Sequence, residues 1–432
     1  MRATRRRGST RTPAVLGWAL WDWGASAFSA IIVTFVFAVY LTDAVAADPD
    51  AGARALGLAL TAAGVCVALL APVTGQRADA RGRRKVWLGV HSAVVIACMA
   101  AMFAVRDEQA YLLLGLVLLA VASVFFEFAE VNYNALLVAV STRETRGRVS
   151  GFGWGMGYFG TVVVLAFVLF AFVQPDVGLF GVTAQDGLNI RAVALTAALW
   201  FAVFALPLFL LVPEAPASGE AVPRNVLASY AVLGRRIAQM WRSDRRLLAF
   251  LGASAIYRDG LAAVFTFGGV IAAGTFGFSQ AEVVVFAIAA NLTSGLGALV
   301  GGRLDDRLGP KAVIVASLAG MLLAGTLLVL FTGRAAFWVC GLALSVFLGP
   351  AQSASRTFLV RVVPPAREGE AFGLYATTGR AVSFLGPLAF TGFVAAFGTQ
   401  RAGMVGIVLV LLAGLVAVLP ITGPRGDEAR AA

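Results

Sequence analysis

Seven ionisable side chains lie within long apolar stretches of this 432-residue sequence. A charge at the centre of a membrane helix costs about 2.5–3.5 kcal/mol on insertion scales, so such a residue marks either a fixed ion pair or a transport pathway. Both interpretations are open for the set, and we expect at least two of its members to serve transport. The seven residues are Asp22, Glu127, Glu130, Arg258, Asp259, Arg356 and Arg380.

The acidic members of this set could carry protons. Glu127 and Glu130 are three residues apart, which places them on one face of a helix, and Asn134 lies further along that face. Two carboxylates so close together cannot both be ionised cheaply, so one of them is expected to hold a proton. A proton-coupling site requires this property. The candidates for proton coupling are therefore Asp22, Glu127, Glu130 and Asp259.

The basic members could bind a solute. The planar guanidinium of arginine matches a carboxylate with two parallel hydrogen bonds, and it stays charged when buried. We expect Arg356 to hold a carboxylate of the solute, with Arg258 or Arg380 as a second contact. The alternative is that Arg356 is a permanent partner of Glu130. Arg258 and Asp259 are adjacent, about 100° apart around a helix, so they cannot both point the same way. The substrate-binding candidates are Asn134, Arg258, Gln352, Arg356 and Arg380.

Membrane helices must position these residues, because the composition is that of a membrane protein. Hydrophobic residues make up 59% of the sequence and charged residues 13%, whereas soluble domains carry about 25% charged residues. Twelve apolar runs each reach the roughly 20 residues that are needed to cross the hydrocarbon core. We predict an all-α membrane protein with six spans in residues 1–212, a cytoplasmic linker at 213–245, six spans in 246–421 and a cytoplasmic tail at 422–432.

The distribution of arginine and lysine supports this count of spans. If the N-terminus is cytoplasmic and the loops alternate, almost all loop arginines and lysines fall on the cytoplasmic side, as the positive-inside rule requires. The outer segments then hold only Arg54, Arg106, Arg191, Arg334 and Arg401. We therefore predict that both termini are cytoplasmic.

Several other classes of protein are excluded by charge placement and by motifs. The net charge of +11 comes from short clusters between apolar runs, which fits membrane topology and not a nucleic-acid-binding face. The sequence contains no ATP-binding loop, no H-E-x-x-H and no G-x-S-x-G motif, so we predict that the protein is not an enzyme. Cys66, Cys98 and Cys340 have no metal-ligand spacing, and we expect no metal and no cofactor.

The two halves of the sequence are related by internal repeats. Residues 75–85 share glycine, arginine, aspartate and lysine positions with residues 301–311 at a shift of 226 residues. At a shift of 222 residues, glycines of 147–151 coincide with glycines of 369–373. These matches run in the same direction along the chain, so we predict two parallel six-helix repeats.

The first repeated loop resembles a signature of the major facilitator superfamily, which reads roughly G-x-x-x-D-x-x-G-R-R/K. The matching residues are Gly75, Asp79, Gly82, Arg83 and Arg84, and Ala80 stands where the superfamily usually has arginine. The resemblance implies two parallel halves about an axis along the membrane normal. It also implies that Asp79 and Asp305 tie the halves together in the outward-open state, by meeting the positive N-terminal end of a helix in the other half or its arginines. The predicted cytoplasmic gate comprises Gly75, Asp79, Arg83, Arg84, Asp305 and Arg307.

Five further stretches resemble one branch of that superfamily. They are WDWGASAF at 21–28, YNALL at 133–137, GRVSGFGW at 147–154, YRDG at 257–260 and QSASR at 352–356. The branch is the vacuole-effluxer-like family, which comprises fungal vacuolar amino-acid effluxers linked to autophagy and their bacterial relatives. The resemblance implies solute efflux, with amino acids as the best-known cargo, and a place in the bacterial inner (cytoplasmic) membrane.

Taken together, these features predict a secondary active transporter that works by alternating access. We expect it to export a small polar solute such as an amino acid, coupled to protons or to another ion, and to act as a monomer in the lipid bilayer without nucleic acid. Two alternatives stay open: a drug or sugar exporter of the same fold, and a transporter-like receptor or lipid-flipping protein. A drug exporter would tolerate the loss of any single arginine.

Overall fold

The structure is a computed structural model that describes residues 12–214, 218–219, 225–243 and 245–423. Residues 1–11 and the predicted tail beyond residue 423 lie outside the described residues. Within the described part of the chain, twelve helical segments are long and apolar enough to cross a membrane. The prediction of an all-α protein with twelve spans is therefore confirmed.

The N-terminal half of the chain supplies six of these segments, and short stretches of other helical types extend some of them. The first span passes from an α-helix through a π-helical turn, and its continuation is bent at Val36, which has non-helical backbone angles. The elements are α1 (Thr12–Ala27), η1 (Phe28–Phe35), α2 (Phe37–Tyr40), η2 (Leu41–Val45), α3 (Pro49–Arg81), α4 (Arg84–Ala101), η3 (Met102–Ala104), η4 (Gln109–Tyr111), α5 (Leu112–Ala135), α6 (Leu137–Val140), α7 (Arg146–Val168), η5 (Leu169–Val173), η6 (Leu179–Gly181), η7 (Gln185–Gly187) and α8 (Leu188–Leu211).

The C-terminal half repeats this plan after a connecting helix. That helix, α9, lies inside the predicted linker and packs against α3 and α10, so it touches both halves. The eleventh span is divided into two helices by a break at residues 383–384. The elements are α9 (Val226–Ser243), α10 (Arg246–Phe276), α11 (Gln280–Leu308), α12 (Pro310–Leu330), α13 (Arg334–Val362), α14 (Glu368–Val382), α15 (Leu385–Phe397) and α16 (Gln400–Val418).

Helix ends follow local sequence signals. Gly82 and Gly277 adopt left-handed conformations, with φ of 60° and 67°, and end α3 and α10. Ser279 and Glu282 form a capping box that starts α11. Asp48 accepts a hydrogen bond from the Ala51 N–H at the start of α3.

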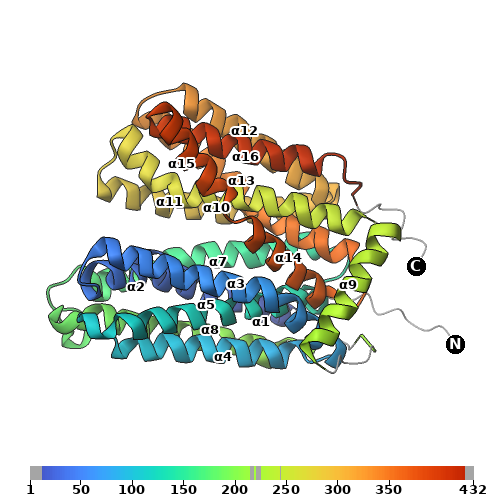
Figure 1. The fold of residues 1–432 in the computed structure, drawn as a ribbon, viewed down its shortest axis with the longest axis horizontal. Helices are drawn as coiled ribbons and strands as arrows, with labels where there is room; N and C mark the ends of the chain where they lie inside the picture. The colour runs from blue at the N-terminus through green and yellow to red at the C-terminus, as the bar shows by residue number, and fades with distance from the viewer. Residues whose placement is uncertain (1–11, 215–217, 220–224, 244, 424–432) are drawn as a thin grey trace.

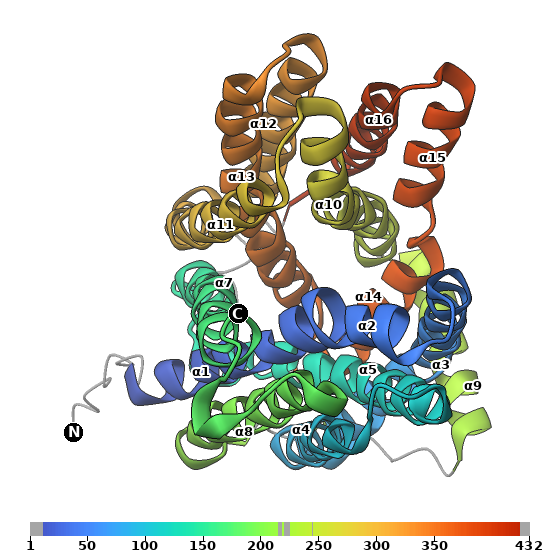
Figure 2. The ribbon, with the colours of Figure 1, turned by 90° about the vertical axis from the view of Figure 1, so that its left-hand side faces the viewer.

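The two halves lie one above the other, with their helices running roughly side by side (Figure 1). Figure 2 shows that α14 lies between the halves, although it belongs by sequence to the second. We call the end of the bundle at which α9 lies the linker end. The turn after α3 and the turn between α11 and α12 lie at this end (Figure 1).

The most extensive contacts between the halves are those of α3 with α14 and of α7 with α11. Glycine allows both approaches. A Cβ atom at Gly147 would lie 2.5 Å from the Gly302 carbonyl oxygen, and one at Gly373 would lie 2.6 Å from the Pro72 Cα. The glycines involved lie in the linker-end parts of their helices, so the halves are held together at that end.

Candidate functional site

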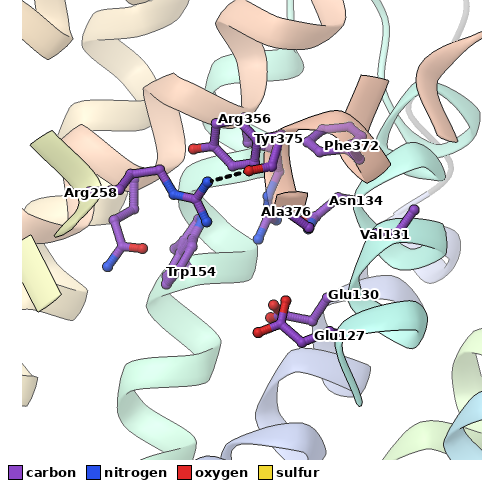
Figure 3. A pocket seen from close by; sticks show the side chains of 11 residues that line it. Glu127, Glu130, Val131, Asn134, Trp154, Arg258, Arg356, Phe372, Tyr375 and Ala376 are labelled. Atoms are coloured by element: carbon purple, nitrogen blue, oxygen red, sulfur yellow. Dashed lines mark hydrogen bonds between the residues drawn. The ribbon is translucent and has the colours of Figure 1, made fainter. Parts of the chain in front are cut away.

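A cavity of about 120 Å³ lies between the two halves. Its walls come from α5 and α7 of the first half and from α10, α13 and α14 of the second (Figure 3). The cavity is therefore built from both repeats, and it contains six of the nine residues predicted for proton coupling or substrate binding. Its lining residues are Glu127, Glu130, Val131, Asn134, Trp154, Arg258, Gln352, Arg356, Phe372, Tyr375 and Ala376.

One wall of the cavity is the face of α5 that carries Glu127, Glu130 and Asn134. Figure 3 shows the carboxyl groups of Glu127 and Glu130 extending from α5 to the same side. Glu127 accepts a hydrogen bond from Arg380 of α14, so this pair bridges the two halves. Among the described residues, Glu130 has neither a hydrogen-bonding partner nor an ion-pair partner. The α5 wall thus presents one paired and one unpaired carboxylate.

Arg258 reaches the cavity from α10, on the opposite side from the two glutamates (Figure 3). Its Nη1 donates a hydrogen bond to the Tyr375 carbonyl oxygen at 3.1 Å. Its guanidinium carbon lies 3.7 Å from the centre of the Tyr375 ring, which is a cation–π contact. Within the described residues Arg258 makes no ion pair, so its charge faces the cavity without a carboxylate partner.

Arg356 of α13 is nearly buried, with 5% of its surface exposed, and it lines the same cavity. Its Nη2 lies 3.7 Å from Oδ2 of Asp22 on α1. The rings of Trp18, Tyr133 and Trp154 surround the guanidinium, with centroids 5.2–5.4 Å from its central carbon. The alternative pairing of Arg356 with Glu130 is therefore wrong, because α1 places Asp22 closer to Arg356.

Asp22 is itself held in place by the packing of the first span. The Tyr133 hydroxyl donates to Asp22 at 3.3 Å, and the Tyr133 ring stacks on Trp18 and Trp21 at centroid distances of 4.6 and 4.3 Å. The Trp18 Nε1 donates to the Tyr133 carbonyl oxygen at 3.1 Å. These contacts fix α1 against α5 and position Asp22 beside Arg356.

Gln352 and Trp154 complete the polar lining. Gln352 Nε2 donates to the Tyr158 hydroxyl at 3.3 Å, which links α13 to α7. Three buried polar atoms of lining residues have no hydrogen-bond partner among the described residues: Trp154 Nε1, Asn134 Oδ1 and Arg356 Nη1. Buried polar atoms are rarely left unpaired, so these atoms are available to bind water or a polar solute.

Asp259 was predicted to be a proton-coupling candidate, but the structure places it outside the cavity lining. Its carboxylate accepts a hydrogen bond from the Gly386 N–H at 2.5 Å, where α15 begins. Because Arg258 and Asp259 are adjacent on α10, they point to different neighbours, as the helical geometry requires.

The predicted gate residues Gly75, Asp79 and Arg84 gather at the linker end. Asp79 accepts hydrogen bonds from the backbone N–H groups of Gly369 and Glu370, at 3.1 and 2.9 Å, at the start of α14. A helix N-terminus is favourable for such a negative charge. Gly75 has no side chain to separate α3 from the Gly369 carbonyl.

Arg84 is the buried cation beside Asp79. Its Nε lies 2.6 Å from Asp79 and its Nη2 lies 2.7 Å from Glu368, and only 1% of its side chain is exposed. Arg236 of α9 contacts Glu370, so the connecting helix also reaches the cluster. The repeated loop of the N-terminal half, at residues 75–85, therefore closes the linker end through a buried, charged contact with α14.

The prediction that Asp305 ties the two halves together is wrong, because its polar partners lie in its own half. Asp305 is fully buried and contacts Thr357 and Arg361, both on α13 of its own half. Its neighbour Asp306 makes the contact between the halves, accepting from the N–H groups of Gly147 at 2.7 Å and Arg148 at 3.2 Å. The two residues are about 100° apart around α11, and the rotation of α11 turns Asp306 toward α7.

Two further gate predictions do not match the structure. Arg83 and Arg307 are exposed, and neither makes an ion pair within the described residues. Their neighbours in sequence, Arg84 and Asp306, make the contacts instead.

Several site residues were missed by sequence reasoning. Trp154, Phe372 and Tyr375 line the cavity but look like ordinary aromatic residues of apolar runs. The aligned glycines at 147 and 369 did carry a signal for the gate, because acidic residues flank Gly369 and arginines flank Gly147. The missed gate residues are Arg236, Asp306, Arg361, Glu368 and Glu370.

Comparison with known proteins identifies the family. The profile of the family described as vacuole effluxer Atg22 like matches residues 138–431. The chain belongs to this Atg22-like family. The uncharacterized MFS-type transporter YxiO of Bacillus subtilis (strain 168) is 24% identical over 404 residues, which cover 92% of each chain.

More distant relatives agree with this assignment. Autophagy-related protein 22 of Cryptococcus neoformans var. neoformans serotype D (strain B-3501A) is 24% identical over 298 residues, which cover 65% of this chain and 52% of that protein. This chain thus matches about half the length of this fungal relative of the Atg22-like family.

Solved structures establish the fold. The proton:xylose symporter XylE, bound to 6-bromo-6-deoxy-D-glucose, has a TM-score of 0.72 at 15% identity, covering 98% of both chains. The Escherichia coli fucose:proton symporter FucP has a TM-score of 0.73 at 13% identity, covering 96% of this chain and 100% of that one. The predicted major facilitator fold is confirmed, and the Atg22-like chain is a multi-pass membrane protein of a transporter family.

Proposed function

We propose that this Atg22-like protein exports a small solute that carries both a positive and a negative group, such as an amino acid, by proton-coupled alternating access. The observation that carries the proposal is the polarity of the cavity. The α5 wall offers acceptors, namely the carboxylates of Glu127 and Glu130 and the buried Asn134 Oδ1. The other walls offer donors, from Arg258, Arg356 and Trp154.

A zwitterionic solute suits this arrangement because both of its charges find partners. Its ammonium group would approach Glu130, which has no basic partner among the described residues. Its carboxylate would approach Arg258, whose present polar contact is a carbonyl oxygen. Arg356, which we expected to be the first contact, already has Asp22 at 3.7 Å and serves as the second. A buried charge without a partner is costly, so solute binding gains free energy at both ends.

The family description supports efflux from a compartment, and the charge distribution supports the orientation of the chain. The family description names effluxers. The linker end carries the basic segment from Arg77 to Lys85, so we assign it to the cytoplasm of a bacterium by the positive-inside rule. The gate contacts of Asp79 and Asp306 are closed at that end, so the proposed state has its cavity directed away from the cytoplasm.

Proton coupling is proposed for the glutamate pair on α5. Protonation of Glu127 would remove the charge that holds Arg380 of α14, and so would loosen a bridge between the halves. Protonation of Glu130 would remove the charge proposed to hold the ammonium group of the solute. Each event favours a different step of the transport cycle, which is what coupling requires.

The test of cargo compares three ligands that differ by one charged group. The purified protein is screened by thermal shift against alanine, ethylamine and propionate, since a ligand at 100 times its Kd adds about 2.7 kcal/mol to stability. We expect stabilisation by alanine, and by larger amino acids if they fit, but little by either analogue. Glu130→Gln should weaken the response to alanine, whereas Glu108→Gln, at an exposed residue outside the cavity, should not. An equal response to alanine and propionate would contradict the zwitterion proposal.

The test of coupling uses proteoliposomes. Glu130→Gln should still exchange solute at equal, saturating concentrations, with a raised KM, but should lose accumulation driven by a proton gradient. If gradient-driven transport survives in both Glu127→Gln and Glu130→Gln, the pair is not the coupling site.

Arg258→Lys replaces the planar fork by a point charge and should weaken amino-acid binding while the fold is kept.

A further inference from the structure

The eleventh span is interrupted at a defined place. Pro387 has no N–H, and its ring excludes a regular helical position of the Ser383 carbonyl four residues earlier, so the helix breaks at Ser383 and Phe384. Regular helical bonding resumes where the Leu388 N–H donates to the Phe384 carbonyl at 2.9 Å. In a continuous helix the Gly386 N–H would donate to the Val382 carbonyl.

Asp259 replaces the acceptor that the break removes. Its Oδ2 accepts from the Gly386 N–H at 2.5 Å, and the residue is 6% exposed. A Cβ atom at position 386 would lie 2.7 Å from the Ala263 Cβ and 3.2 Å from the Asp259 carbonyl oxygen. Glycine at 386 is therefore needed for α15 to approach α10 closely enough for this bond. Asp259, Gly386 and Pro387 thus act together at the break: the proline interrupts the helix, the glycine allows close packing and the acid accepts the freed N–H.

The two parts of the span pack against different halves of the protein. The first part in chain order, α14, packs against α3 and α5 of the N-terminal half, as well as against α10. The second part, α15, packs against α16 and α10 of its own half. Figure 2 shows α14 between the halves and α15 beside α16. The break thus separates a segment that packs against both halves from a segment that packs against its own half.

The helix α14 connects the gate to the cavity. Its first turn donates two N–H groups to Asp79, and Tyr375 and Arg380 contact cavity residues 258 and 127 further along. A helix of 15 residues is about 22 Å long, so movement at one end of a rigid α14 is felt at the other.

Residues 258 and 259 of α10 hold the two parts by bonds of different kinds. Arg258 holds α14 through the Tyr375 carbonyl, and Gly379 leaves room for it, because a Cβ there would lie 3.2 Å from the Arg258 Nη1. That bond faces the cavity and is open to competition by a solute. The Asp259 bond is buried between α10 and α15, away from the cavity lining.

We propose that Asp259 is a positioning residue that fixes α15 to the C-terminal half, so that α14 alone moves as the gate helix when the linker end opens. The inference rests on the alternating access proposed above, but not on the identity of the solute. Asp259 acts here as a hydrogen-bond acceptor for Gly386, and its charge is not needed for a proton-carrying step.

The experiment measures two distances by pulsed electron paramagnetic resonance in the full chain with Cys66, Cys98 and Cys340 replaced by serine. One label pair, Arg83→Cys with Pro364→Cys, uses exposed residues at the linker end to report the gate. The other, Leu388→Cys with Leu409→Cys, uses exposed residues of α15 and α16. The gate is opened by Asp79→Ala, so no solute is required, and a wrong choice of solute would not affect the outcome.

With Asp259 intact, opening the gate should lengthen the first distance by at least about 5 Å, the scale of known switching shifts, and leave the second unchanged. Asp259→Ala should broaden the second distance distribution in the open protein. Asp259→Asn, which keeps an oxygen acceptor, should keep that distribution narrow, and Ser254→Ala on the same helix serves as the control.

Three results would overturn the proposal. The first is movement of both distances together with Asp259 intact, since the span would then move as one piece. The second is equal broadening in Asp259→Asn and Asp259→Ala, which would show that the charge and not the acceptor matters. The third is a narrow distribution in Asp259→Ala. If Asp259→Ala does not fold, the wild-type pair of distances and the Asp259→Asn variant still decide between these outcomes.

Discussion

The two sites at which the halves meet at the linker end solve the same problem with different residues. At the contact between α3 and α14, one carboxylate, Asp79, both pairs with an arginine of its own half and accepts from the N-terminus of the facing helix. At the contact between α7 and α11, these tasks are largely divided: Asp305 pairs with Arg361 at 3.0 Å, and Asp306, which lies 3.9 Å from the same guanidinium, accepts from the facing helix. The two contacts therefore share the same arrangement of helices, but different residues make the ion pair and accept the backbone hydrogen bonds.

The charge of the facing helix also differs between the two sites. The first turn of α14 carries Glu368 and Glu370, which add negative charge beside Asp79 and require Arg84 and Arg236. The first turn of α7 instead carries Arg146 and Arg148, and Arg148 pairs with Asp306 of α11 at 3.6 Å. At the α14 contact one buried cation, Arg84, pairs with two carboxylates, so we expect this contact to be more sensitive to the loss of a single cation.

The largest effect is expected from Arg84→Ala. This change leaves Asp79 and Glu368 buried without their cation, and breaking a buried ion pair by removing one partner costs about 3–5 kcal/mol. The free energy of unfolding in detergent should fall by that amount. The control is Arg83→Ala, at an exposed neighbour that makes no ion pair, and it should have no effect. Similar stability of the two variants would show that the α14 cluster is not held by Arg84.

The next largest effect is expected from Asp79→Asn on the gate equilibrium. The variant weakens two charge-assisted bonds to α14, and hydrogen bonds to charged groups contribute about 1.5–3 kcal/mol. The population open at the linker end should rise at least about tenfold, since 1.4 kcal/mol is a factor of ten. Distance distributions across that end measure the population. No change in them would mean that other contacts hold α3 to α14.

A smaller effect should separate Asp306 from Asp305. Asp306→Asn should open the linker end less than Asp79→Asn does, because the Asp306 side chain is 12% exposed and the corresponding value for Asp79 is 4%. Asp305→Asn should lower thermal stability through Thr357 and Arg361 and leave the distances between the halves unchanged. If Asp305→Asn moved those distances and Asp306→Asn did not, the division of roles between the two residues would be reversed.

The smallest effect is expected from Arg148→Ala. Its ion pair with Asp306 is long, at 3.6 Å, and the Arg148 side chain is 58% exposed. Exposed pairs contribute about 0–1 kcal/mol. Stability and gate distances should therefore change little, and less still at high salt. A loss comparable with that of Arg84→Ala would remove the contrast between the two contact sites.

The proposed solute site was predictable in outline because the cost of burying charge makes a few residues stand out in a hydrophobic sequence. Glu127, Glu130 and Asn134 follow from helical periodicity, Arg258 and Arg356 from their position in apolar runs, and Gln352 from the shift of 222 residues that places it opposite Glu130. The aromatic lining could not be found in the same way, because Trp154 and Tyr375 do not differ locally from other aromatic residues of membrane helices.

What the sequence determined by itself was the set of spans and their repetition, because hydrophobic length, the placement of arginines and a shift between similar loops are all local or additive properties of the chain. What only the tertiary structure decided was the choice of partners. Arg356 pairs with Asp22, Asp306 takes the role expected of Asp305, and Asp259 supports α15. Each choice depends on the rotation of a helix about its own axis, where one residue corresponds to about 100°, and that rotation is set by packing against helices distant in the sequence.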